Sequence, residues 1–155
     1  MYAEIIKKSK EVSFVLNNLC ADTENELIAT FGSDWKNHVQ NELKRLQRKY
    51  YVIKLKANNE PVGIYGLIPL KHKVAGIFLL TTDNLHKGNV IGFLRGCKKQ
   101  IDLWQKDYDL IMDLHYKKNQ TVKKWLKTLG FEASERFQNE HFQVYYKGNI
   151  GLYNE

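Results

Sequence analysis

The chain has 155 residues, a length that fits one compact domain able to fold without disulfide or metal staples. Its 43% apolar and 26% charged residues are typical of a globular protein, and no apolar run approaches membrane-spanning length. Two cysteines without a Cys-x-x-Cys motif exclude a disulfide framework, and no signal peptide or metal site is visible, so we expect a reduced cytoplasmic protein with no membrane contact. The net charge of +7 favours anionic partners without choosing between nucleic acid, acidic proteins and phosphorylated cofactors.

The first 50 residues predict one short strand, at residues 3–6, and three helices. The first helix begins at Ser9, and its apolar residues recur at i, i+3, i+4 and i+7. The second is expected to begin at a cap, Asp22, and to end at Gly32. A third amphipathic helix places four apolar residues on one face: Trp35, Val39, Leu43 and Leu46.

Three antiparallel strands are expected next. Apolar Ile53 and Leu55 alternate with Lys54 and Lys56, which predicts a half-buried strand. The turn at residues 58–61 connects it to a second strand at residues 62–68 as a hairpin. Residues 74–82 are continuously apolar, as in a central strand covered on both faces.

The rest of the chain alternates helix and strand. After a loop at residues 83–89, a helix repeats apolar side chains at Phe93, Cys97, Ile101 and Trp104. A buried strand at residues 109–114, a helix at residues 119–129 and two final strands follow. The order predicts an α/β fold with a mixed, mostly antiparallel central sheet flanked by helices.

The most specific pattern runs from Asn119 to Phe131. A small apolar residue follows Asn119 by three positions, an aromatic residue by six, and Gly130-Phe131 by eleven and twelve. Physically, this is an amphipathic helix that ends at a left-handed glycine, with Asn119 either capping the helix or contacting a ligand. The spacing and the element order resemble the GNAT superfamily of N-acetyltransferases.

That resemblance implies the acyl-CoA N-acyltransferase (GNAT) fold over a single domain, residues 1–155. Residues 1–50 would hold the N-terminal strand and the helices of the acceptor side. Residues 51–146 would hold the sheet and the acyl-CoA-binding core, and residues 147–155 a tail.

Residues 51–146 also resemble small GNAT-like proteins encoded by podoviral bacteriophages, through residues 77–83, 93–97 and 125–131. In that group a virion structural or assembly role has been assigned beside the acetyltransferase-like fold. The resemblance therefore implies a second location, the virion, and virion proteins as partners.

The GNAT resemblance implies acetyl-CoA as acyl donor, lying where the strand at residues 74–82 splays from the strand at residues 110–114. The backbone of Leu80 and Thr82 would pair with the pantetheine arm, and the pyrophosphate would sit at the start of the helix around Gly92. The usual glycine-rich pattern is absent there, so a plain helix-initiating turn stays an alternative. The residues implied in donor binding are Leu80, Thr82, Lys87, Gly88, Asn89, Gly92, Asn119 and Lys124.

Acetyl transfer to an amine needs a base for the amine and an acid for the leaving thiolate. Many GNAT enzymes supply the acid from a tyrosine seven residues after the helix asparagine, where this chain has Leu126. By position, Asp83, His115 and Tyr116 are the candidate catalytic residues. Alternatively, Asp83 caps a turn and His115 is a satisfied surface residue.

Three functions fit these patterns. The first is direct transfer of an acetyl group from acetyl-CoA to a primary amine of unknown identity. The second is a non-catalytic GNAT-fold phage protein. The third is a basic nucleic-acid-binding module that uses Tyr50, Tyr51, Lys54 and Lys56, although no nucleic-acid motif is recognisable.

Overall fold

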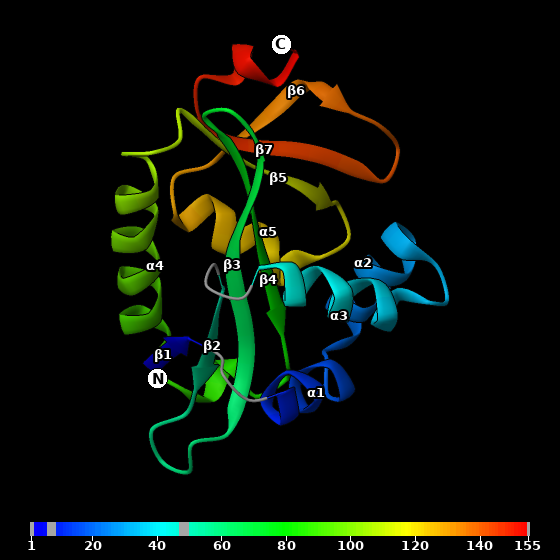
Figure 1. Ribbon diagram of the computed structural model, residues 1–155, viewed down its shortest axis with the longest axis vertical. Coiled ribbons are helices and arrows are strands. Elements are labelled where there is room, and N and C mark those ends of the chain that lie inside the picture. The colour runs from blue at the N-terminus through cyan, green and yellow to red at the C-terminus, as the bar shows by residue number, and fades with distance from the viewer. Residues whose placement is uncertain (1, 6–8, 47–49, 155) are drawn as a thin grey trace. The chain divides into compact units, whose positions relative to one another are not determined.

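The computed structural model describes residues 2–5, 9–46 and 50–154 (Figure 1). Its helices and strands follow the predicted order, with two short 3-10 helices, η1 and η2, in addition. The elements are β1 (Tyr2–Ile5), α1 (Ser9–Asn17), α2 (Ala21–Phe31), α3 (Trp35–Arg45), β2 (Tyr50–Lys54), β3 (Pro61–Lys71), β4 (Val74–Thr81), η1 (Leu85–Lys87), α4 (Val90–Trp104), β5 (Leu110–Tyr116), α5 (Gln120–Thr128), β6 (Glu132–Gln138), β7 (Phe142–Gly148) and η2 (Ile150–Asn154).

The seven strands are hydrogen-bonded in the order β1-β2-β3-β4-β5-β7-β6. β4 and β5 run parallel, whereas β1–β2, β2–β3, β5–β7 and β6–β7 are antiparallel pairs. The predicted mixed, mostly antiparallel sheet is therefore confirmed.

The chain forms two compact units that interleave in sequence. Unit 1 comprises Met1–Leu67 and Phe78–Val90, and unit 2 comprises Ile68–Ile77 and Ile91–Glu155. β3 and β4 each contribute residues to both units. The organisation of residues 1–155 as a single domain stays a prediction.

Unit 1 contains the helices α1, α2 and α3, and α2 lies against α3 (Figure 1). α2 begins at Ala21, so Asp22 lies in its first turn and the extended Cys20 takes the cap position predicted for Asp22. Gly32 ends α2 as predicted, with its N–H donating to the Ile28 carbonyl at 2.8 Å. The predicted face of α3 is confirmed, because all four of its apolar side chains are buried. Ile6, the last residue of the predicted first strand, lies outside the described residues.

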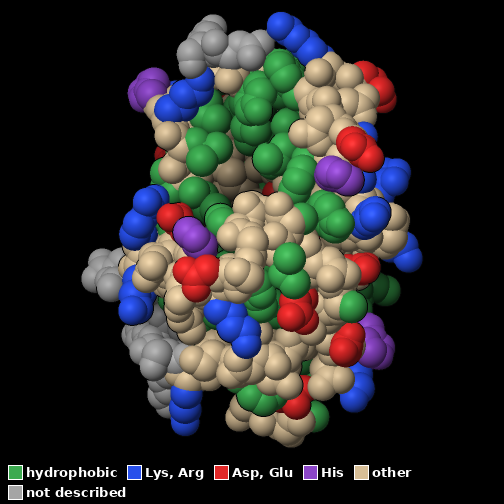
Figure 2. All heavy atoms as spheres, turned by 90° about the vertical axis from the view of Figure 1, so that its right-hand side faces the viewer, with side chains coloured by type: hydrophobic (Ala, Val, Ile, Leu, Met, Phe, Trp, Pro, Cys, Tyr) green, Lys and Arg blue, Asp and Glu red, His purple; other side chains and the backbone are tan. Residues whose placement is uncertain are grey.

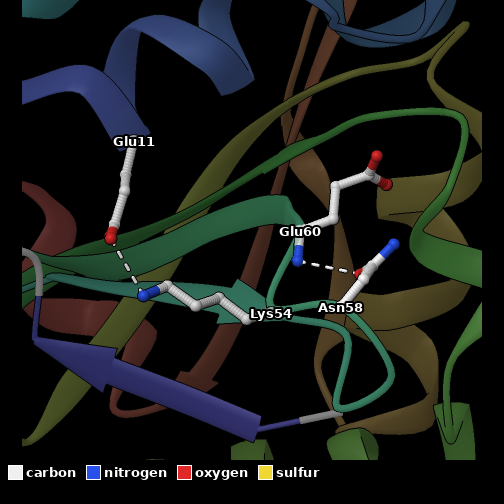
Figure 3. Close-up of polar contacts among 4 residues, drawn as sticks. All are labelled: Glu11, Lys54, Asn58 and Glu60. Atoms are coloured by element: carbon white, nitrogen blue, oxygen red, sulfur yellow. Dashed lines mark hydrogen bonds and ion pairs between the residues drawn. The ribbon is translucent and has the colours of Figure 1, made fainter.

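The predicted alternation of buried and exposed residues in β2 is wrong at Lys54. The pairing of β2 with β3 shifts register between Ile53 and Lys54, and both side chains are buried. The residue skipped in this pairing is Val62 of β3, so β2 keeps its period of two, and Ile53 and Lys54 are buried on opposite faces of the strand. The Lys54 ammonium is paired inside unit 1 with Glu11 of α1, at 2.9 Å (Figure 3).

Unit 2 is built around β5, which pairs along its whole length with β7. With Val74 of β4, these strands form the apolar cluster of Val74, Leu110, Met112 and Val144. Ile150 and Leu152 pack against this cluster, so the predicted tail, residues 147–155, instead contains the end of β7 and the helix η2. Among the described residues, no helix is both long and apolar enough to cross a membrane.

Candidate functional site

The Asn119-to-Phe131 segment of unit 2 folds as its spacing predicts. The Asn119 side-chain oxygen accepts a hydrogen bond from the Val122 N–H at 3.2 Å, which caps α5. At the other end, Gly130 has φ 87°, and the Phe131 N–H donates to the Leu126 carbonyl at 3.0 Å. These two bonds satisfy backbone groups that a helix leaves unpaired at its ends. The capping interpretation of Asn119 is confirmed, and its side chain is 0% exposed.

Within unit 2, the parallel ladder between β4 and β5 is short. It consists of three residue pairs and ends at Gly76↔Met112, although both strands continue. We call the edge of β4 that faces away from β3 its outer edge. Beyond Gly76, this outer edge is therefore not paired with β5 in this ladder. A strand edge without a partner strand offers backbone groups to which an extended ligand can add.

Leu80 and Thr82 do not present their backbone to this outer edge. In unit 1 the Thr82 N–H and its hydroxyl both donate to the Val62 carbonyl of β3, each at 3.0 Å. The Leu80 carbonyl lies 3.0 Å from the position that a Cβ on Gly63 of β3 would occupy, so it also faces β3. Neighbouring residues of a strand direct their backbone groups to opposite edges, so Thr81, not Leu80 or Thr82, faces outward. The expected pairing of Leu80 and Thr82 with pantetheine is corrected accordingly.

The predicted phosphate loop also belongs mainly to unit 1. Lys87 is exposed at the end of η1, and Gly88 and Asn89 follow it directly before α4. Gly88 is extended, with φ −97°, a conformation open to any residue, so its backbone does not require glycine. Gly92 is exposed in the first turn of α4 and belongs to unit 2.

Asp83 is exposed directly after Thr82. The turn at this point is closed by the Thr82 hydroxyl, which accepts a hydrogen bond from the Asn84 N–H at 3.3 Å. The Asn84 side chain in turn donates to the Glu60 carboxylate at 2.9 Å. Among the contacts of the described residues, no hydrogen bond to the Asp83 side chain stabilises this turn.

His115 is buried, with 1% of its surface exposed, and the expectation of a satisfied surface residue is wrong. Its ring packs edge-on against the Tyr145 ring, with centroids 5.1 Å apart. Neither ring nitrogen has a hydrogen-bond partner among the described residues. Loss of hydration, with a smaller contribution from the Lys123 charge, lowers the pKa of His115 to about 4. The imidazole is therefore neutral at physiological pH.

The other candidates in unit 2 differ in accessibility. Tyr116 is half-buried, with its ring 5.5 Å from the Phe142 ring, and its carbonyl accepts a hydrogen bond from the Asn119 N–H at 2.9 Å. Lys124 is exposed on α5, whereas Leu126 is 0% exposed. His115 and Tyr116 end β5 with their side chains on opposite faces, and the turn to α5 connects the Tyr116 backbone to Asn119.

Sequence reasoning missed a polar cluster in unit 1. The Cys20 thiol lies 3.1 Å from the Thr81 hydroxyl and 3.3 Å from the Thr23 hydroxyl, and the two hydroxyls lie 3.0 Å apart. Cys20 and Thr81 are separated by 61 residues along the chain. No local periodicity relates residues at such a separation, so no signal in the sequence could have found the cluster.

The residues proposed for nucleic-acid binding do not form a shared exposed surface. Tyr50 is buried, Lys54 is paired with Glu11, and Tyr51 stacks on Tyr65 with centroids 5.2 Å apart. Figure 2 shows basic and acidic side chains interspersed on the face in view. In the described part of the chain, no group of three or more His, Cys, Asp or Glu residues could hold a metal ion.

No protein-family model matches the sequence, and no curated protein matches it. Solved structures do match. The ribosomal-protein-S5-alanine acetyltransferase of Vibrio fischeri is similar with TM-score 0.59 and 20% identity, over 96% of this chain and 92% of that one. The Campylobacter jejuni N-acetyltransferase PseH, in complex with acetyl coenzyme A, has TM-score 0.59 and 14% identity, over 96% and 99%.

A chimera of the spermidine N-acetyltransferase SpeG of Vibrio cholerae and hSSAT covers 100% of both chains with TM-score 0.60 and 15% identity. At such low identities the likeness establishes the fold. The chain therefore has the acyl-CoA N-acyltransferase (GNAT) fold, as its sequence predicted.

Proposed function

We propose that the protein is an N-acetyltransferase that moves the acetyl group of acetyl-CoA directly to a primary amine. The observation that carries this proposal is the Asn119-to-Phe131 motif, which folds at the end of β5, a strand whose ladder with β4 stops after three pairs. The likeness to acetyltransferase structures over nearly the whole chain supports it. Fold alone does not fix a reaction, so the local geometry carries the proposal.

Acetyl-CoA supplies an activated acetyl thioester when bound. We assign its pyrophosphate to the start of α4, where the positive end of the helix dipole favours an anion, with Lys87, Gly88, Asn89 and Gly92. The exposed Lys124 would contribute positive charge. The outer edge of β4 would pair with the pantetheine arm. Asn119 would act through its cap, because its side chain is fully buried.

In the proposed transfer, the amine nitrogen attacks the thioester carbonyl carbon, an N–C bond forms and the C–S bond breaks. The amine gives up a proton, and the leaving thiolate takes one. The half-buried Tyr116 hydroxyl would donate to sulfur, and solvent would take the proton of the amine, because His115 is buried and a pKa of about 4 makes it a weak base. Asp83, exposed after β4, would hold the cationic form of the acceptor.

Calorimetry with acetyl-CoA at moderate salt tests this proposal. We expect the wild-type chain to bind, Asn119→Ala to bind more weakly, and Asn119→Ser to keep most of the affinity, because serine also caps a helix. Equal affinity of all three variants would leave Asn119 as a structural cap only. Absence of binding at high micromolar acetyl-CoA would contradict the enzyme.

A second candidate is a non-catalytic role for the same scaffold, including the virion structural or assembly role implied by the phage resemblance. Leu126 favours it, because this side chain is fully buried in apolar packing at the position where many GNAT enzymes place an acidic tyrosine. Orientation of bound reactants alone accounts for much rate enhancement, so a missing acid does not decide the question. Binding of acetyl-CoA without acetylation of any primary amine would favour the scaffold.

A further inference from the structure

Residues 18–20, between α1 and α2, pair with the end of β4 like a short extra strand, and we call this segment the strap. The Cys20 N–H donates to the Thr81 carbonyl at 3.0 Å, and Leu19 forms an isolated antiparallel bridge with Thr82. The Thr82 N–H is bonded to β3, so the Thr81 carbonyl points to the opposite, outer edge. The strap therefore covers the outer edge of β4 at Thr81.

Few contacts hold the strap to β4. Besides the backbone pairing, the Cys20 thiol, the Thr23 hydroxyl and the Thr81 hydroxyl form a closed triangle of contacts of 3.0–3.3 Å. Thr23 and Thr81 are 0% and 1% exposed, whereas Cys20 is only half-buried. None of these contacts is an ion pair, and a thiol is a weak hydrogen-bonding group. The contacts between the strap and β4 are specific, and another extended segment that pairs with β4 can replace them.

We propose that the strap is an autoinhibitory contact, which an acyl donor displaces from Thr81 when it binds. This inference rests on the proposed function, in which the pantetheine arm adds to the outer edge of β4. Paired strands lie about 4.8 Å apart, so an arm that pairs with Thr81 needs the space that Cys20 occupies. A free strand edge also attracts unwanted pairing, so covering it protects the unliganded protein.

Cys20 allows the strap bond to be removed without distorting the backbone. Its φ of −65° and ψ of 157° match proline, so Cys20→Pro deletes the N–H and the thiol at little conformational cost. Cys20→Ala deletes the thiol contacts and keeps the N–H. Ala21→Pro is the matched control, because Ala21 is the first residue of α2, where proline is well tolerated.

Calorimetric titration with acetyl-CoA measures the competition. We expect Cys20→Pro to bind about fivefold tighter than wild type, the factor expected for one hydrogen bond. Cys20→Ala should bind with intermediate affinity, and Ala21→Pro like wild type. If wild type binds and Cys20→Pro binds no tighter, the strap proposal is overturned while the proposed function stands. If no variant binds, the proposed function fails and the strap proposal with it.

Amide hydrogen exchange of the wild-type chain gives a second test that does not depend on the fold of a variant. Ligand binding usually slows exchange, but release of the strap from Thr81 should make the Cys20 amide exchange faster when acetyl-CoA is saturating. Amides of α5 should not speed up. Unchanged or slower exchange at Cys20 in the bound protein would overturn the proposal.

Discussion

The two units differ in how they treat buried polar side chains. In unit 1, the buried polar side chains of the described residues have partners: Lys54 pairs with Glu11, Thr23 with Thr81, and the Thr82 hydroxyl with a β3 carbonyl. In unit 2, both ring nitrogens of His115 are buried without a hydrogen-bond partner among the described residues.

The difference determines whether buried polar side chains raise or lower the free energy of unfolding in each unit. A satisfied polar contact between distant segments locks them together, as the strap and the Glu11–Lys54 pair do in unit 1. An unsatisfied buried polar group costs about 1–3 kcal/mol, because it loses water and gains nothing in return. Unit 2 bears such a cost at His115, four residues before the Asn119 cap. Breaking pairs in unit 1 should therefore destabilise the protein, whereas removing the unpaired His115 imidazole in unit 2 should not.

The largest effect is expected from Lys54→Met in unit 1. The ammonium and carboxylate side chains are only 10% and 14% exposed, so the substitution strands a buried Glu11 carboxylate. We expect a loss of about 4 kcal/mol in the free energy of unfolding, measured by urea denaturation. The double variant Glu11→Leu/Lys54→Met should recover most of it, because neither charge remains. Equal losses in the single and double variants would show that packing of the lysine stem matters rather than the pair.

The next effect is the pH dependence caused by His115 in unit 2. Its pKa is 6.5 in the unfolded chain and about 4 in the folded one, so between these values the unfolded chain binds more protons. Stability should therefore fall as the pH falls from 6.5 to 4 and level off below, with a loss of about 3 kcal/mol.

The control for this effect is His115→Leu. It should remove this part of the pH dependence and be at least as stable as wild type at pH 7, since it buries no unpaired nitrogen. Parallel stability–pH curves of the two proteins would contradict the assignment.

The smallest effects concern two exposed glycines of unit 2. Gly130 has φ 87°, so Gly130→Ala should cost about 1 kcal/mol, although an added Cβ would have room. Gly96 lies inside α4 with nothing within 4 Å of an added Cβ, and Gly96→Ala should raise stability by about 0.5–1 kcal/mol. Thermal unfolding should show opposite shifts. If both variants shifted the unfolding temperature in the same direction, the left-handed backbone at Gly130 would not be the reason for glycine at that position.

Local patterns predicted the elements of the fold well. The Asn119 cap, the left-handed Gly130 and the buried face of α3 depend on residues within a few positions of one another, and all three are confirmed. The errors lie where a distant segment intervenes. Lys54 alternates as an exposed residue should, but it is buried and paired with Glu11, 43 residues away.

The candidate site was predicted less completely than the fold. The family resemblance assigned Leu80 and Thr82 to donor binding. The edge of β4 that their backbone groups face depends, however, on the register of β4 with β3. For His115 the sequence left a catalytic role and a surface position open, because nothing near it in the sequence indicates the Tyr145 ring that packs against it. The roles of Asp83, His115 and Tyr116 stay predictions.

By itself the sequence determined the order of helices and strands and the ends of α5, because periodicity and end signals act over a few residues, whereas the GNAT fold was implied by a resemblance to that family. Only the tertiary structure decided that Thr81 faces the outer edge of β4, that the strap covers it, and that His115 is buried without a partner. Those features depend on strand register and on contacts between segments tens of residues apart. A one-residue shift in register moves every side chain of a strand to the opposite face of the sheet, and no local pattern records it.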